Sequence, residues 1–352
     1  MVIVLAALTM ALAGCTAAAP SPGSSTTRTT APGSGLTTTT TTLPVPVALQ
    51  GTSVPGDAFL GIVRRVPVVA VPAGRPSAAF PLPGTPPYLL IQQVAYRQFG
   101  SGPDLLLVMG QDGSMSWWEP SLLAVLAQHY RVTVFDLPGV GYSSPALVPM
   151  TLDWLADETA GLVQALGLVN TVVLGWGLGG AVALALAERH PASETSLVLV
   201  DSSIGGPDAV QPAAAVQAAL DAPTATASSL ATTLFGAAPS SSTAGATSAE
   251  SLWLSALDAN VPDNLTQRAL DEEREVQLSL WSSTALSTGV GSVVVPTLVA
   301  YGDDDAVFPA PDGLLLRRAI AGSERDVLPG AGYAAMYEDS SRFVADLEQF
   351  TG

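Results

Sequence analysis

The chain has 352 residues, of which 48% are hydrophobic and 12% charged, so it can bury the core of one large domain or two modest ones. Acidic residues outnumber basic ones 30 to 13, giving a formal net charge of -17. This charge argues against nucleic acid and anionic lipid surfaces as partners, because both bind through clustered Lys and Arg. The single cysteine, Cys15, excludes an intrachain disulfide and a thiolate metal cluster.

The first fifteen residues have the pattern of a lipoprotein signal. An apolar run from Val2 to Leu12 leads into Leu12-Ala13-Gly14-Cys15, which resembles a bacterial lipobox. We therefore expect residues 1–15 to be a signal peptide and Cys15 to carry lipid, anchoring the protein on the outer face of a bacterial cell membrane. A buried N-terminal helix with an incidental cysteine is the alternative. The apolar run is too short for a transmembrane span.

Two segments of low structural content follow. Residues 16–44 are dominated by Ser, Thr, Pro, Gly and Ala, which predicts a solvated, disordered tether. Residues 45–87 contain apolar stretches interrupted by prolines, which predicts an extended lead-in with room for an edge strand.

From residue 88 onward the pattern alternates between strands and helices. Short apolar runs predict buried strands at residues 105–109, 132–135, 171–174, 197–200, 293–301 and 324–328. Helical spacing between them predicts helices at residues 120–129, 151–166, 180–189 and 311–321. This order predicts an α/β fold with a mostly parallel central sheet flanked by helices, built from residues 88–204 and 292–352.

The alternation breaks between residues 205 and 291. Helical stretches there, at residues 213–220, 249–257 and 265–280, surround a Ser/Thr/Ala-rich loop. An insertion between two strands of the sheet predicts a helical cap over the sheet edge.

Five segments resemble the α/β-hydrolase family. Residues 105–113 (LLLVMGQDG) look like its oxyanion strand and loop, and residues 134–143 (VFDLPGVGYS) like its D-x-x-G-x-G-x-S turn. Gly175-Trp176-Gly177-Leu178-Gly179 stands where the family has its G-x-S-x-G nucleophile elbow. Residues 301–309 (YGDDDAVFP) resemble the turn that carries the catalytic acid, and residues 330–333 (GAGY) stand where the family has G-x-G-His.

The resemblance implies a degenerate catalytic triad. Asp305 matches the acid, but Gly177 stands at the nucleophile position and Tyr333 at the base. The backbone N–H groups of Gln111 and Leu178 match the oxyanion donors. Glycine has no side-chain oxygen to acylate, and a phenol is a poor general base near neutrality. We therefore expect a pseudohydrolase that binds a small apolar ligand or a protein partner, with no metal and no cofactor.

Three alternatives remain open. A different histidine could replace Tyr333, but His129 and His190 lie at predicted helix ends and are expected to be surface or capping residues. An enzyme could use other chemistry through Asp305 and Tyr333. Finally, residues 175–180 also satisfy the G-x-G-x-x-G dinucleotide fingerprint, with Asp201 following 21 residues after Gly180 as the ribose-binding carboxylate.

Overall fold

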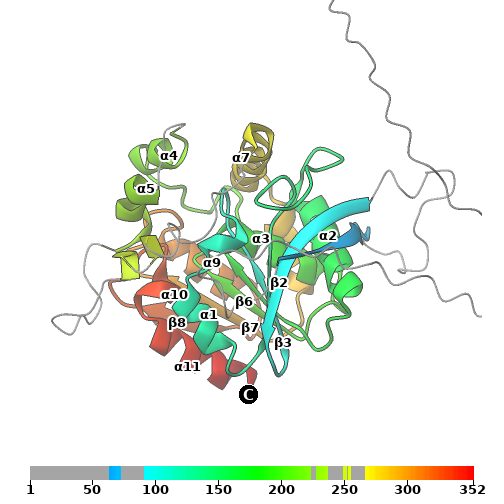
Figure 1. Ribbon diagram of the computed structural model, residues 1–352. Helices are drawn as coiled ribbons and strands as arrows, with labels where there is room; N and C mark the ends of the chain where they lie inside the picture. Colours follow the sequence, from blue (N-terminus) through cyan, green and yellow to red (C-terminus); the bar gives the residue numbers. More distant parts are fainter. Residues whose placement is uncertain (1–62, 73–90, 223–226, 237–248, 252, 255–265) are drawn as a thin grey trace, which may run out of the picture. The chain divides into compact units, whose positions relative to one another are not determined.

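A computed structural model describes residues 63–72, 91–222, 227–236, 249–251, 253–254 and 266–352 (Figure 1). The expected signal peptide with Cys15, the tether over 16–44 and most of the lead-in over 45–87 lie outside the described residues. Among the described helices, none has both the length and the apolar composition that crossing a membrane requires.

The described residues form one eight-stranded sheet in the order β1-β2-β4-β3-β5-β6-β7-β8. The strands are β1 (Arg64–Val69), β2 (Ile91–Gly100), β3 (Asp104–Val108), β4 (Arg131–Phe135), β5 (Val172–Trp176), β6 (Ser196–Val200), β7 (Thr297–Gly302) and β8 (Glu324–Leu328). All pairings among β3 to β8 are parallel, whereas β2 pairs antiparallel with both β1 and β4. The predicted mostly parallel sheet is confirmed, and β1 forms one of its edges.

Helices cover both faces of the sheet. The flanking helices are α1 (Pro120–Leu126), α2 (Leu152–Leu166), α3 (Leu178–Arg189), α9 (Ala310–Ala319), α10 (Ala335–Glu338) and α11 (Ser340–Thr351). Helices α2 and α3 pack against each other, while α1 and α11 pack together on the other side of the sheet from α2 (Figure 1). With helices on both faces, every residue of β3 and β5 is buried, which explains their continuous apolar sequences.

The residues at the two ends of α2 explain where this helix begins and ends. The Thr151 hydroxyl accepts a hydrogen bond from the Trp154 N–H at 3.1 Å, and so caps the N-terminus of α2. Gly167 ends the same helix in the left-handed conformation, with φ of 62°.

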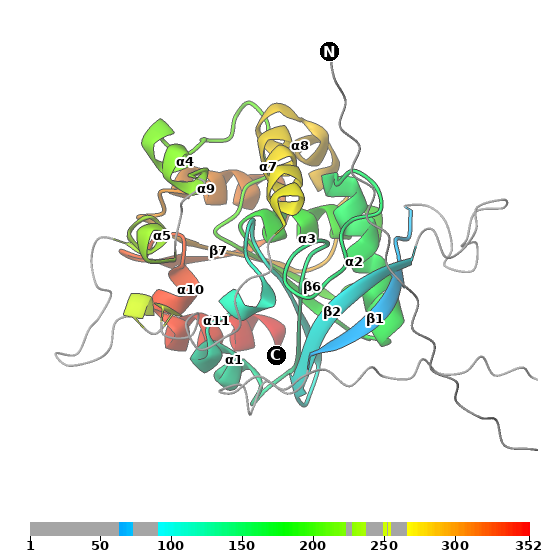
Figure 2. The ribbon, with the colours of Figure 1, turned by 45° about the horizontal axis from the view of Figure 1, so that its top comes forward.

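The insertion between β6 and β7 lies over the carboxyl ends of several strands. Its helices are α4 (Ala214–Leu220), α5 (Ala227–Leu234), α7 (Gln267–Ser282) and α8 (Ala285–Gly289) (Figure 2). The Glu273 carboxylate of α7 accepts from the Asp112 N–H beyond β3, and Leu280 O accepts from the Gly206 N–H beyond β6. Leu234 O of α5 accepts from the Ala334 N–H beyond β8. The contacts to Asp112 and Ala334 join the insertion to the segments that follow β3 and β8, whereas the contact to Gly206 holds α7 against the start of the insertion.

Several elements differ from the sequence prediction. Strand β2 contains Gln92, Gln93 and Arg97, so its apolar residues form no continuous run, and it was not predicted. The terminal helix α11 was not predicted either. Strand β7 begins at Thr297, later than expected, because Pro296 has no N–H to contribute to the sheet. The expected helix at 249–257 lies partly outside the described residues.

Candidate functional site

Gly177 occupies a sharp turn between β5 and α3. Its backbone has φ of 58° and ψ of -121°, a conformation that residues with a side chain rarely adopt. The Gly177 N–H donates to Val200 O at 3.0 Å, and the buried Ser202 hydroxyl donates to Gly177 O at 2.7 Å. The turn therefore keeps the geometry of a nucleophile elbow. Glycine removes the strain that a side chain would cause there, on the order of 1–3 kcal/mol.

The Tyr333 hydroxyl fills the space beside Gly177. A Cβ placed on Gly177 would overlap that hydroxyl and would lie 2.8 Å from the Tyr333 Cζ atom. The Tyr333 ring is stacked on Trp176, with centroids 4.8 Å apart, and on Phe308, with centroids 5.8 Å apart. Trp176 Nε1 also donates to Tyr333 O at 2.7 Å. Tyr333 is thus held in the position where a nucleophilic side chain would lie.

Asp305 lies in the turn after β7 and has one unsatisfied carboxyl oxygen. Its Oδ1 atom accepts from the N–H groups of Val307 and Phe308, at 2.7 and 3.0 Å. Its Oδ2 atom is buried and has no hydrogen-bond partner within the described part of the chain. Burial raises the pKa of Asp305 well above its ordinary value. In a working triad a histidine would satisfy that oxygen.

Tyr333 does not take over the role of that histidine. No hydrogen bond joins its hydroxyl to Asp305 among the described residues. Burial raises the pKa of Tyr333 well above its ordinary value, and the nearby carboxyl groups of Asp305 and Asp201 raise it further. The phenol therefore stays neutral and is a worse base than an exposed tyrosine.

The two backbone N–H groups expected as oxyanion donors belong to the loop after β3 and to the first residue of α3. Leu178 begins α3 directly after Gly177, and Gln111 follows β3. Neither backbone N–H donates a hydrogen bond to any described residue. A Cβ on the neighbouring Gly110 would lie 2.8 Å from the Tyr333 hydroxyl, so this tyrosine borders both donor positions.

The glycines of the dinucleotide-like motif have packing roles. A Cβ on Gly175 would overlap Gly179 O, and a Cβ on Gly179 would overlap Val108 O of β3. A Cβ on Gly180 would overlap the Ser202 hydroxyl. These glycines let α3 approach the sheet closely, which accounts for the pattern without a nucleotide.

Asp201 is not available to a ribose. It is fully buried, its Oδ1 atom accepts from the Gly302 N–H at 2.8 Å, and its Oδ2 atom accepts from the Ala335 N–H at 3.3 Å. Burial raises its pKa well above the ordinary value, and the nearby Asp305 raises it further. Asp201 thus joins the ends of β6 and β7 to the segment that carries Tyr333.

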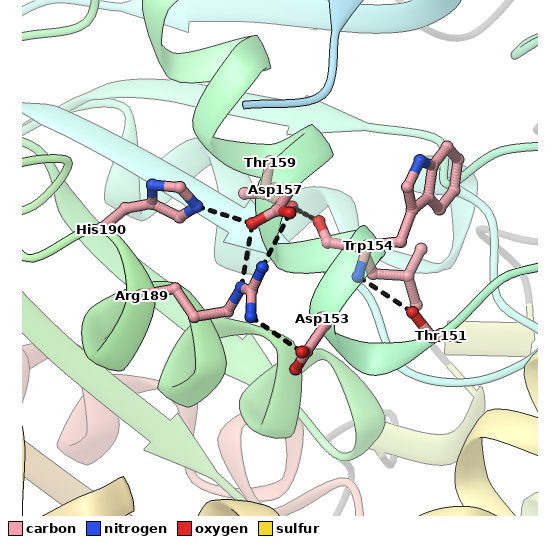
Figure 3. Close-up of polar contacts among 8 residues, drawn as sticks. Thr151, Asp153, Trp154, Asp157, Thr159, Arg189 and His190 are labelled. Atoms are coloured by element: carbon pink, nitrogen blue, oxygen red, sulfur yellow. Dashed lines mark hydrogen bonds and ion pairs between the residues drawn. The ribbon is translucent and has the colours of Figure 1, made fainter. Parts of the chain in front are cut away.

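Neither histidine contacts the turn at Gly177. His129 Nε2 lies 3.0 Å from Glu348 Oε1, and its side chain is half-exposed. His190 ends α3, and its Nε2 atom lies 2.8 Å from Asp157 Oδ1 on α2 (Figure 3). Arg189 binds the same carboxylate, through Nε to Oδ1 at 2.9 Å and through Nη2 to Oδ2 at 2.8 Å. His190 therefore joins two helices and is more buried than a surface position.

A pocket lies between the insertion and the sheet, beside Tyr333. Its cavity volume is about 60 Å³, and it opens partly to solvent. Aromatic side chains supply much of its wall, namely Trp117, Trp281, Phe308 and Tyr333. The adjacent Trp118 is buried and packs near Trp176, with centroids 6.1 Å apart, so only the first of the two neighbouring tryptophans lines the pocket.

Two carboxyl groups near this pocket were not singled out by the sequence. Glu273 on α7 is fully buried, and its Oε2 atom accepts from the Asp112 N–H at 2.7 Å. Burial raises the pKa of Glu273 to about 8 and that of Asp112 to about 6. The pair joins residues 161 positions apart, so no local pattern indicates it. The Asp136 carboxylate joins the turn after β4 to the loop after β3, since it accepts from the N–H groups of Tyr142 and Met115 at 2.8 and 2.7 Å.

No set of three His, Cys, Asp or Glu side chains in the described residues is arranged to hold a metal ion.

Comparison with known proteins gives consistent matches. The family model described as alpha/beta hydrolase fold matches residues 105–340. Pimeloyl-[acyl-carrier protein] methyl ester esterase from Aeromonas hydrophila is 41% identical over 111 residues, 31% of this chain and 42% of that esterase, so the match covers less than half of its length. A hydrolase from Dechloromonas aromatica, 2-hydroxy-6-oxononadienedioate/2-hydroxy-6-oxononatrienedioate hydrolase 1, is 26% identical over 71% of this chain and 88% of its own. The crystal structure of a hydrolase from Pseudomonas aeruginosa has a TM-score of 0.60 and 27% identity, covering 74% of this chain and 95% of that one.

Proposed function

Because this chain belongs to the α/β-hydrolase fold family, we propose that it is a catalytically inactive member, a pseudohydrolase that binds a small, largely apolar ligand or a protein partner. One observation carries the proposal. The Tyr333 hydroxyl occupies the volume in which a side chain at Gly177 would have to lie. The site therefore lacks a nucleophile, and it also lacks the room to hold one.

The remaining groups support the same conclusion. Hydrolysis through an acyl-enzyme needs a nucleophile and a base that takes its proton. Gly177 supplies no nucleophile, and the neutral, buried Tyr333 is not hydrogen-bonded to Asp305. The pocket beside these residues persists, with an aromatic wall suited to an apolar ligand.

An enzyme that uses Asp305 and Tyr333 for other chemistry is the competing function. The same assay separates the two. The full chain is incubated with aryl esters, amides and epoxides, beside an Asp305→Asn variant. We expect both proteins to match the buffer blank. Turnover by the wild-type chain that Asp305→Asn abolishes would overturn the pseudohydrolase proposal and support the competing enzyme.

We further propose that Cys15 carries lipid and holds the folded part outside a bacterial membrane. The support is the lipobox-like sequence Leu12-Ala13-Gly14-Cys15 followed by the Thr/Pro/Ser-rich segment over 16–44. In a bacterial host, the wild-type chain should incorporate labelled palmitate and enter the detergent phase. Cys15→Ala should do neither, and equal labelling of the two chains would contradict the anchor.

A further inference from the structure

The pocket beside Tyr333 has a polar part that includes a hydrogen-bond acceptor without a partner among the described residues. Its polar lining side chains, besides Tyr333, are Gln111, Asp112, Gln217 and Gln277. Gln111 Nε2 donates to Asp112 Oδ2 at 3.0 Å, and Gln217 Nε2 donates to Asp221 Oδ1 at 3.1 Å. A carboxylate only accepts, so each amide must turn its NH₂ end to its acid and keep its carbonyl oxygen for other donors.

Asp112 adds a further acceptor. Its Oδ1 atom is buried and has no hydrogen-bond partner among the described residues. The Glu273 carboxyl, whose Oε2 atom accepts from the Asp112 backbone N–H, has a pKa of about 8 and is largely neutral at pH 7, so the unpaired acceptor of this corner is Asp112 Oδ1. A buried acceptor without a donor costs about 1–3 kcal/mol, so this corner favours a ligand that brings donors.

The charges around the pocket also favour a cation. No Arg or His is among the described residues that line it. Arg274, the nearby cation, is already paired with Asp221, with Nη2 and Oδ2 2.6 Å apart. The chain as a whole carries a formal charge of -17, so its field attracts positive ligands.

We infer that the pocket binds a small apolar amine, with the ammonium group held by Asp112 and the Gln111 and Gln217 carbonyl oxygens. The hydrocarbon part would pack against the aromatic wall that includes Trp117 and Trp281. This inference rests on the proposed function, because it names the ligand of the same pocket. It also departs from ester binding, since an ester has acceptors and no donors.

The surroundings of Asp112 predict how binding depends on pH. Burial raises the pKa of Asp112 to about 6, and the charges that face it are Asp221, which raises it further, Arg274, which lowers it, and Glu273. An ammonium group binds the ionised carboxylate, so amine affinity should be full at a pH well above the Asp112 pKa of about 6 and should fall as the pH drops through that value. Glu273, with a pKa of about 8, is largely neutral at pH 6, so it does not titrate in the same window.

Three probes of the same shape test the inference on the full chain. Benzylamine, benzyl alcohol and benzoate are titrated separately at about pH 7, followed by the fluorescence of Trp117 and Trp281 and by calorimetry. We expect benzylamine to bind about tenfold or more tightly than either counterpart, the difference that charge-assisted hydrogen bonds give. The preference should shrink at about pH 5, where Asp112 is protonated.

Matched variants assign the effect to Asp112. Asp112→Asn should lose about tenfold in benzylamine affinity and leave benzyl alcohol unchanged. Asparagine tolerates the left-handed backbone of this residue, with φ of 60°, so the variant should fold. Glu275→Gln removes one negative charge from the exposed face of α7 and should leave affinity unchanged.

Several results would overturn the amine inference. They are equal or tighter binding of benzyl alcohol or benzoate, benzylamine binding that Asp112→Asn leaves intact, and no binding of any probe. Binding of a neutral or anionic probe would still agree with a binding pseudohydrolase. The pseudohydrolase proposal itself fails only in the hydrolysis assay described above, so the two failures are distinguishable.

Discussion

Asp157 and Asp305 are buried to the same extent, 7% and 6% exposed, but their surroundings are opposite. Asp157 on α2 receives Arg189 on both carboxyl oxygens and His190 on one of them (Figure 3). Within the described part of the chain, Asp305 after β7 receives two backbone N–H groups, both on Oδ1. A His–Asp pair therefore exists in this fold, but it joins α2 to α3 and not the turns at the pocket.

The difference shows how a carboxyl group's neighbours decide its role. Asp157 binds the Arg189 guanidinium and the His190 ring, and so works as a link between helices. Asp305 stands where the sequence resemblance expects a catalytic acid, but no cationic side chain binds it among the described residues, and burial raises its pKa. A position inherited from a family is therefore not sufficient evidence for chemistry, because the partner residue determines what the carboxyl can do.

The largest effect is expected when a histidine is placed beside Asp305, because Asp305 would then have the kind of partner that Asp157 has. In the double variant Gly177→Ser/Tyr333→His, the hydroxyl obstruction disappears and an imidazole is placed on the segment that Asp305 faces. We expect hydrolysis of p-nitrophenyl acetate to rise about 100-fold over either single variant, the lower range of a general base. Adding Asp305→Asn should remove the gain. A folded double variant without turnover would contradict the triad assignment.

Gly177→Ser alone tests whether Tyr333 leaves room for a side chain at position 177. Its side chain would adopt a strained backbone and collide with Tyr333, so the free energy of unfolding should fall by about 3 kcal/mol. Urea denaturation measures this loss, and no esterase activity should accompany it. Combining it with Tyr333→Ala should restore part of the stability lost to the collision. A fully stable single variant would show that Tyr333 moves aside easily.

Removing the charge of each aspartate sharpens the contrast in stability. Asp157→Asn removes the carboxylate that Arg189 and His190 share and leaves Arg189 with the more exposed Asp153, 2.8 Å from its Nη1 atom. It should lower the free energy of unfolding by about 2 kcal/mol. Asp305→Asn keeps an oxygen for the N–H groups of Val307 and Phe308, and should change it by less than about 1 kcal/mol. Chemical denaturation of the two variants under one condition gives the comparison. Equal losses in the free energy of unfolding would mean that the two carboxyl groups contribute equally to stability, which would contradict the comparison.

Glu158, next to Asp157 in sequence, resembles Asp305 in having a buried carboxyl with a raised pKa. We therefore expect it to make stability depend on pH. Its carboxyl is buried, its Oε1 atom has no partner in the described region, and burial raises its pKa to about 8. Between its ordinary pKa and 8 the folded state binds more protons than the unfolded state, so stability should fall as pH rises. Glu158→Gln should flatten that fall by on the order of 1 kcal/mol per pH unit. The exposed Glu275→Gln should leave the slope unchanged.

The parts that could be predicted from sequence are those encoded locally. Continuous apolar runs such as Leu105–Val108 mark strands buried on both faces, and the glycine-rich elbow marks its own turn. Strand β2 was not predicted because its polar residues interrupt the apolar sequence. The close approach of Tyr333 to Gly177 and the contact of Glu273 with Asp112 were not predicted from the sequence for another reason. Each depends on how distant segments pack, which no local period records.

The overlap between a side chain at position 177 and Tyr333 also affects the order in which these two residues could be substituted. A chain that gained serine at 177 first would pass through a destabilised form with no base to activate the hydroxyl. A chain that changed Tyr333 first would lose the stacking on Trp176 and Phe308 and gain no reactivity, because Gly177 carries no hydroxyl. Neither first step is favoured by itself, so a serine–histidine pair at this turn would require both substitutions together.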